Sequence, residues 1–212
     1  MLQRLLWAGK PVYCGGGKSR LVALTFDDGP GPWTLSLVAA LRSGDAAGTF
    51  FLVGSRIGYW PEGARAAALA GALGNHTWTH PHLTRLKPSA VRRELQRTQM
   101  RILEATRNLP ALFRPPYEQA GARVDRIARS LNLLDVRWNV DSGDAYPGAT
   151  AGGVARAVAA TVRPGSIVLL HDAHPWTPRA VRLILRSLKR QHLRPVTLQT
   201  LLELDPPRGR CA

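Results

Sequence analysis

The sequence has few cysteines and no long hydrophobic run, and both features narrow the class of protein. Cys14 and Cys211 are the only 2 cysteines in 212 residues. That number is too small for a disulfide framework, and their spacing fits no cysteine-based zinc site. No apolar stretch reaches the roughly 18 residues of a membrane-spanning helix, and residues 1–7 lack the apolar core and cleavage site of a signal peptide. We expect a globular protein that is either cytoplasmic or follows an export or anchor segment outside this sequence.

Acidic residues and lysine are also scarce. Lys plus Arg number 29 against 14 Asp plus Glu, a net charge of +15, and 25 of the 29 are Arg. A polyanionic partner, such as an acidic wall polymer or a nucleic acid, would explain this charge. A compositional bias that places Arg on every exposed face would explain it equally. The basic residues are spread along the chain, whereas a nucleic-acid footprint clusters. We therefore favour the bias and expect no nucleic-acid partner.

Short apolar segments alternate with amphipathic ones along the chain. The expected helices carry start signals at Pro88, at Thr150 and at Thr177–Pro178. Alternating strands and helices predict a parallel sheet or barrel with helices outside it, in a single domain. The strands are expected at residues 21–26, 48–53, 112–113, 133–138, 166–170 and 194–198.

Polar side chains stand where several of these strands end. Asp27 and Asp28 follow the first expected strand, Arg114 follows the third and His171 follows the fifth. In parallel sheets and barrels, functional sites gather at the C-terminal ends of strands. Each residue also has an ordinary explanation: an Asx turn before Gly29, an exposed arginine, or a hydrogen-bonded histidine at a strand end.

A pair of histidines indicates a metal site. His76 and His80 are four residues apart, a spacing that puts two imidazoles on one side of a helical turn. Two surface histidines are the alternative, and Pro81 turns the chain, so we treat His82 as non-ligating. Two histidines and one carboxylate leave metal positions open for water and substrate, in hydrolases and in non-haem iron oxygenases alike. An available base and acid, Asp27 and His171, favour hydrolysis.

Five motifs in order give the chain a specific resemblance. Together they resemble the NodB-type polysaccharide deacetylases, carbohydrate esterase family 4, over roughly residues 21–204. The matching segments are Thr25-Phe26-Asp27-Asp28-Gly29, His76-Thr77-Trp78-Thr79-His80, Arg114-Pro115-Pro116-Tyr117, Asp141-Ser142-Gly143-Asp144 and Leu169-Leu170-His171.

The resemblance implies an α/β fold, a distorted (β/α) barrel of about seven strands. It implies that Asp28, His76 and His80 bind a divalent metal, with zinc the first choice and cobalt, nickel or manganese as alternatives. Asp27 would be the general base and His171 the general acid.

The resemblance also implies supporting residues. Arg114 would orient the base, and Asp144 would tune the acid. The backbone N–H of Tyr117 would stabilise the oxyanion, and Leu169 would line the pocket for the acetyl methyl group.

Two positions depart from the family pattern. Ala145 stands where the fourth motif normally continues with Trp, followed here by Tyr146, and Glu118 stands where Gly normally follows Tyr117. The implied activity is removal of N-acetyl groups from amino sugars of a polysaccharide such as peptidoglycan or a chitin-like oligomer. The alternatives are an O-acetyl esterase acting on xylan, a small-molecule amide hydrolase, and a glycan-binding protein without catalysis.

The expected organisation is an arm at residues 1–19, a catalytic domain at 20–205 and a tail at 206–212, in a monomer. In a closed barrel the chain ends come close, so we expect Cys14 to pair with Cys211 in an oxidising compartment. The sequence thus predicts an exported or envelope enzyme, with a cytoplasmic protein carrying two free thiols as the alternative.

Overall fold

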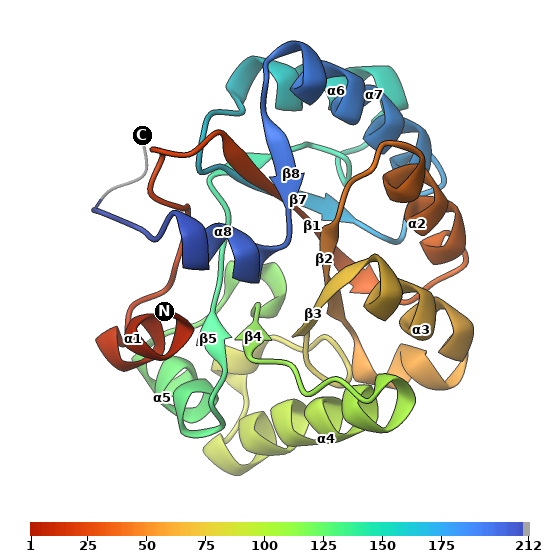
Figure 1. Ribbon diagram of the computed structural model, residues 1–212. Helices are drawn as coiled ribbons and strands as arrows, with labels where there is room; N and C mark the ends of the chain where they lie inside the picture. Colours follow the sequence, from red (N-terminus) through yellow and green to blue (C-terminus); the bar gives the residue numbers. More distant parts are fainter. Residues whose placement is uncertain (210–212) are drawn as a thin grey trace.

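Eight parallel strands form one curled sheet in the computed structural model, which describes residues 1–209 (Figure 1). Seven of them lie in the order β5-β4-β3-β2-β1-β7-β6, and β8 pairs with the start of β1. This arrangement confirms the predicted distorted (β/α) barrel. The strands are β1 (Leu21–Gly29), β2 (Gly48–Leu52), β3 (Gly71–Asn75), β4 (Leu112–Phe113), β5 (Leu134–Asp135), β6 (Val140–Asp141), β7 (Ile167–His171) and β8 (Arg194–Val196).

Helices surround the sheet, and α8 lies across one end of it in Figure 1. None of the helices in the described part of the chain combines the length and hydropathy that a membrane crossing requires. The α-helices are α1 (Leu2–Ala8), α2 (Thr34–Ser43), α3 (Pro61–Ala70), α4 (Pro88–Thr106), α5 (Ala122–Ser130), α6 (Ala151–Thr161), α7 (Thr177–Arg190) and α8 (Leu198–Leu204). Short 3₁₀ turns are η1 (Gly54–Gly58), η2 (Leu83–Arg85) and η3 (Pro116–Glu118).

Alternation along β1 separates the outer core from the barrel interior. Val22, Leu24 and Phe26 join the core cluster that includes residues of α2, α6 and α7. Leu21 and Ala23 belong to a second cluster, with residues of α8 among its members. Side chains two apart on a strand share a face, so Thr25 and Asp27 continue this inner row toward the C-terminal end. The barrel interior is therefore apolar at the α8 end and polar at the other end.

The N-terminal arm bridges the chain just after β5 and the chain just before β7. Val12 donates its N–H to the carbonyl of Asp135 at 3.0 Å, and its own carbonyl accepts the N–H of Arg137 at 2.7 Å. Gly15 donates to Gly165 at 2.7 Å. The arm thus packs as part of the barrel wall. The predicted domain bounds stay a prediction, and the Cys14–Cys211 pairing involves a residue outside the described part of the chain.

The sequence predicted some elements correctly and missed others. The strand at 112–113, the helix start at Pro88 and the side-chain cap of Thr150 on α6 are confirmed, and the strand expected at 194–198 is present but ends at Val196, because α8 begins at Leu198. A single strand over 133–138 is wrong, because the chain leaves β5 after Asp135 and pairs with Val12 before β6 begins. The N-cap assigned to Thr177 is also wrong: Trp176 is the N-cap of α7, and the Thr177 hydroxyl bonds to a buried carboxylate.

Strand β3 escaped prediction because its sequence, Gly-Ala-Leu-Gly-Asn, is poor in the branched and aromatic residues that favour strands. The small residues have a packing reason. A Cβ on Gly74 would lie 2.3 Å from Cδ1 of the buried Phe51 ring. Glycine at this position therefore lets the Phe51 ring approach the β3 backbone closely.

Replacement of Gly74 tests this packing. Gly74→Ala should lower the free energy of unfolding by about 1–3 kcal/mol, the usual cost of overpacking a core. As a matched control, a Cβ on Gly152 in α6 meets only the flexible end of Arg156 at 3.4 Å. Gly152→Ala should raise the free energy of unfolding by roughly 0.5–1 kcal/mol. Urea unfolding curves measure both, and equal effects of the two substitutions would contradict the packing argument.

Candidate active site

Two adjacent aspartates reach one side of the barrel end because the backbone turns between them. Asp27 continues the inward row of β1 and is 4% exposed. Regular alternation would send Asp28 outward, but Asp28 adopts a left-handed φ of 71°. Its backbone carbonyl accepts a hydrogen bond from Arg56 Nη1. The turn therefore presents both carboxylates to the same space.

His76 and His80 lie in an irregular loop after β3, so the expected helical turn is wrong. Positive φ angles of 67° at Thr77 and 59° at His80 fold the loop back on itself. The carboxylate of Glu94 on α4 accepts the N–H groups of Trp78 and Thr79, each at 2.8 Å. Loop curvature held by Glu94, and not helical periodicity, brings the two imidazoles to one side.

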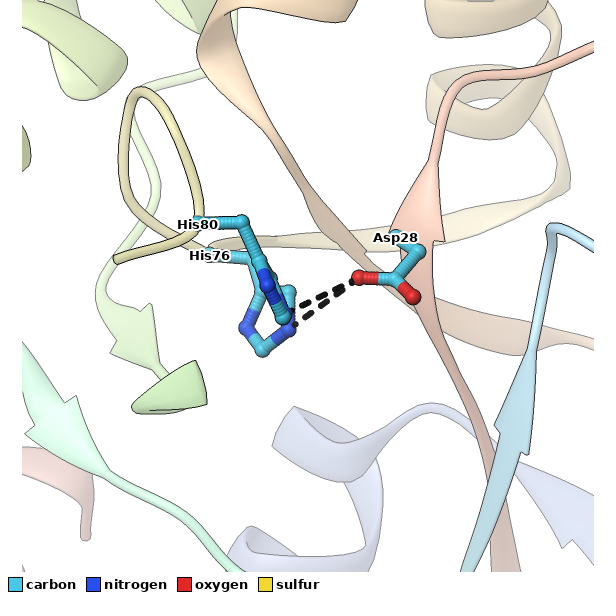
Figure 2. A group of neighbouring side chains, drawn as sticks. All are labelled: Asp28, His76 and His80. Atoms are coloured by element: carbon cyan, nitrogen blue, oxygen red, sulfur yellow. Dashed lines mark ion pairs between the residues drawn. The ribbon is translucent and has the colours of Figure 1, made fainter. Parts of the chain in front are cut away.

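The two imidazoles converge on Asp28 (Figure 2). Asp28 Oδ1 lies 3.6 Å from His76 Nε2 and 3.2 Å from His80 Nε2. One ligand atom from each of the three residues lies within 4.8 Å of the others. Donor atoms about 2.1 Å from a common ion stand roughly 3.0–3.4 Å apart in octahedral or tetrahedral geometry. The spacing of this cluster fits a divalent metal with positions left for other ligands.

The protonation of the cluster also suits a metal. His76 Nδ1 lies 2.7 Å from the Arg114 carbonyl, to which it can only donate, so Nε2 keeps its lone pair toward Asp28. Burial and the neighbouring His76 lower the pKa of His80, which favours the neutral ligand form. Burial opposes the ionisation of Asp28, but the basic groups that surround it, His76 and His80 first, outweigh burial and lower the pKa of the carboxyl, which favours the carboxylate form.

Arg114 fills the polar end of the barrel interior and is fully buried. Its Nη1 donates to Asp27 Oδ1 at 2.9 Å and to the Thr25 hydroxyl at 2.8 Å. Its other nitrogens donate to the carbonyls of Val136 and Arg137. These contacts fix one oxygen of Asp27 and leave Oδ2 directed toward His76, 3.8 Å away.

His171 ends β7, the strand beside β1, in register with Asp27. The buried carboxylate of Asp144 accepts the His171 backbone N–H at 2.7 Å and faces Nδ1 at 2.8 Å. Burial lowers the pKa of the imidazole, but the hydrogen bond and charge of Asp144 outweigh it. With smaller contributions from the two aspartates of β1, the pKa of His171 rises to about 9. The imidazole is thus held as a cation at neutral pH.

The residues that hold Asp144 were not found from the sequence. Trp176 donates its indole N–H to the Asp144 carbonyl at 3.0 Å, and the Thr177 hydroxyl lies 3.2 Å from its carboxylate. Ala145 is exposed, and the Tyr146 hydroxyl donates to Asp141 at 3.1 Å. Trp176 follows an ordinary loop in the sequence, so only the helix-start signal at Thr177 pointed to this region.

The remaining two predicted residues border the same space. Tyr117 is 55% exposed, and its hydroxyl lies 3.1 Å from His80 Nδ1. Leu169 is buried in β7 two residues before His171, so the two side chains share a face of the strand. The structure therefore brings all nine predicted site residues to the C-terminal end of the barrel strands, while their catalytic roles stay predictions.

Comparison with known proteins identifies the family. The sequence model of the polysaccharide deacetylases matches residues 15–136. The chain belongs to the polysaccharide deacetylase family. It is 36% identical to a chitooligosaccharide deacetylase of Rhizobium leguminosarum bv. trifolii over 97% of this chain and 94% of that protein.

Two further family members are similar to the chain. It is 35% identical to a bifunctional xylanase/xylan deacetylase of Cellvibrio japonicus over 92% of its length, but spans only 29% of that larger protein. The crystal structure of the Bc1960 peptidoglycan N-acetylglucosamine deacetylase superposes with a TM-score of 0.86 and 28% identity. This alignment covers 93% of the present chain and 94% of the other. Each of the three matches thus covers more than nine-tenths of the present chain.

Replacement of Asp144 tests its control of His171. Asp144→Asn removes the negative charge that raises the pKa of the imidazole, so that pKa should fall. Where activity needs protonated His171, the alkaline limb of the pH profile of kcat/KM should move to lower pH. Asp141→Asn is the matched control, because Asp141 lies in the same turn but contacts Gly143 and Tyr146.

The raised pKa of His171 should also make the free energy of unfolding depend on pH. The folded pKa of His171 exceeds the unfolded value of about 6.5, so the pair stabilises the fold below that pH and loses this effect as the pH rises through about 9. Asp144→Asn should remove this pH-dependent component from urea unfolding. An unmoved alkaline limb and an unchanged stability profile would show that Asp144 does not tune His171.

Proposed function

We propose that the protein is a metal-dependent hydrolase that removes N-acetyl groups from amino sugars of a polysaccharide. The observation that carries the proposal is the meeting of three groups at one end of the barrel. These are the Asp28–His76–His80 cluster, an aspartate fixed by Arg114, and a cationic histidine fixed by Asp144. A metal cluster with an oriented base and a separate acid is what hydrolysis of an acyl bond requires.

The residues divide the reaction between them. Asp28, His76 and His80 would hold the ion, which when bound polarises the acetyl carbonyl and lowers the pKa of water. Asp27 would accept the proton of the attacking water at Oδ2, because Arg114 occupies Oδ1. The backbone N–H of Tyr117 would stabilise the negative oxygen, and Leu169 would contact the acetyl methyl group.

His171 would complete the reaction by protonating the leaving nitrogen. With Nδ1 bound to Asp144, the Nε2–H of the cation is the proton it can give. A sugar amine is a poor leaving group until it is protonated, whereas a sugar alkoxide leaves more readily. Amide hydrolysis therefore depends on the proton that the Asp144-bound His171 supplies, whereas the alternative O-acetyl esterase needs that proton less.

The family resemblance supports an amino-sugar polymer as substrate, with peptidoglycan and chitin-like oligomers as the first candidates. Xylan stays the second candidate, because one relative is named a xylan deacetylase. A glycan-binding protein without catalysis would not need the paired base and acid. A wall polymer lies outside the cytoplasmic membrane, so we also propose a location at the cell envelope.

Metal removal tests the cluster. Chelation should abolish acetate release from an N-acetylated chitooligosaccharide, and zinc should restore it, with cobalt, nickel and manganese as further ions to compare. His80→Ala should lower the bound metal measured by elemental analysis. His82→Ala, which removes a neighbouring histidine bonded to Gln119, should keep full metal content. Full activity in protein verified to be free of metal would exclude this mechanism.

Substitution of the base and the acid tests their separate roles. Asp27→Asn and His171→Ala should each lower kcat by at least ~100-fold, the usual scale of general acid–base catalysis. Both variants should retain the bound metal, since neither residue belongs to the cluster. Wild-type turnover in either variant would show that the assigned role is wrong.

A further inference from the structure

Arg137 is a buried arginine that the proposed reaction does not use. It lies between β5 and β6 and is 4% exposed. Its Nε and Nη2 form a two-pronged pair with the Asp135 carboxylate, at 2.7 Å and 2.8 Å. The remaining nitrogen, Nη1, donates to the backbone carbonyl of Glu118 at 2.7 Å. Arg137 therefore joins the end of β5 to the turn η3, which carries Tyr117.

The turn that Arg137 reaches is strained. Tyr117 and Glu118 both adopt left-handed backbone conformations, with φ of 58° and 56°. This conformation is unfavourable for a residue that carries a Cβ, so the turn needs external contacts to persist. The Glu118 side chain is exposed, and its nearest oxygen lies 3.8 Å from Arg137 Nη1. The hydrogen bond from Arg137 to the Glu118 carbonyl is therefore the stronger of the two contacts.

The backbone of Arg137 connects the turn to the other half of the site. Its carbonyl accepts a hydrogen bond from Arg114 Nη2 at 2.9 Å. Arg114 in turn fixes Asp27. One residue thus bonds both to the arginine that orients the base and to the turn whose N–H would stabilise the oxyanion. Displacement of the turn would misplace the Tyr117 N–H and would also loosen the contact of the Tyr117 hydroxyl with His80 Nδ1.

We propose that Arg137 is a positioning residue that holds the Tyr117–Glu118 turn in its left-handed conformation, an inference that rests on the proposed function. Its guanidinium acts on the reaction through the Glu118 carbonyl. Glycine at position 118 adopts this conformation without the steric cost, so the need for Arg137 depends on the glutamate that stands there.

A rescue experiment tests this dependence. Arg137→Met should lower kcat by about 10- to 100-fold, the scale of a catalytic group misplaced by an ångström, and leave KM within about twofold. Glu118→Gly alone should change kcat little. In the double variant, Glu118→Gly should recover most of the lost rate.

The matched control separates positioning from general stability. Arg107 is a non-glycine residue with a φ of 63°, at the C-terminal cap of α4 and away from the site. Arg107→Gly should stabilise the fold similarly but should not restore the rate of Arg137→Met. Equal rescue by both glycines, or no loss of rate in Arg137→Met, would overturn the proposal. Should Arg137→Met fail to fold, Arg137→Lys keeps a cation beside Asp135 without the guanidinium fork.

A second readout does not depend on activity. The Gln119 N–H donates to the Pro116 carbonyl at 3.0 Å, so its hydrogen exchange reports the integrity of the turn. Exchange of this amide should accelerate in Arg137→Met and slow again in the double variant with Glu118→Gly. An inactive wild type would count against the proposed function alone, whereas unchanged exchange at Gln119 would count against the role of Arg137.

Discussion

The buried guanidinium of Arg114 is the constraint on which the site depends. A fully buried arginine is costly unless its nitrogens are paired, and here they bond to a carboxylate, a hydroxyl and two backbone carbonyls. The Arg114 carbonyl also fixes the orientation of His76. The base and one metal ligand are therefore positioned by a single residue at the centre of the barrel.

The barrel places Arg114 at the polar end of its interior. Apolar side chains and α8 fill the end where the strands begin, and the inner row of β1 becomes polar at Thr25 and Asp27. Four strands then contribute groups to the same rim: both aspartates from β1, the histidine loop from β3, Arg114 from β4 and His171 from β7. Parallel strands align these ends, so groups far apart in sequence meet without a long loop.

The sequence predicted the barrel and the candidate site residues better than the contacts that hold these residues in place. Asp27, Arg114 and His171 follow apolar strands, so their placement at strand ends could be predicted from the pattern alone. The histidine spacing indicated two imidazoles that do converge on Asp28, but for the wrong reason, because Glu94 and two positive φ angles shape a loop there. The contacts of Trp176 with Asp144 and of Arg137 with Glu118 join distant segments, and no local pattern encodes them.

Comparison of acetate release from matched N-acetylated and O-acetylated oligosaccharides by the metal-loaded protein tests the central claim most directly. A site with a cationic acid beside an oriented base predicts release from N-acetylglucosamine oligomers or peptidoglycan fragments at a higher kcat/KM than from acetylated xylan oligomers. Release from the O-acetylated substrates alone, or from neither class with metal bound, would contradict the account.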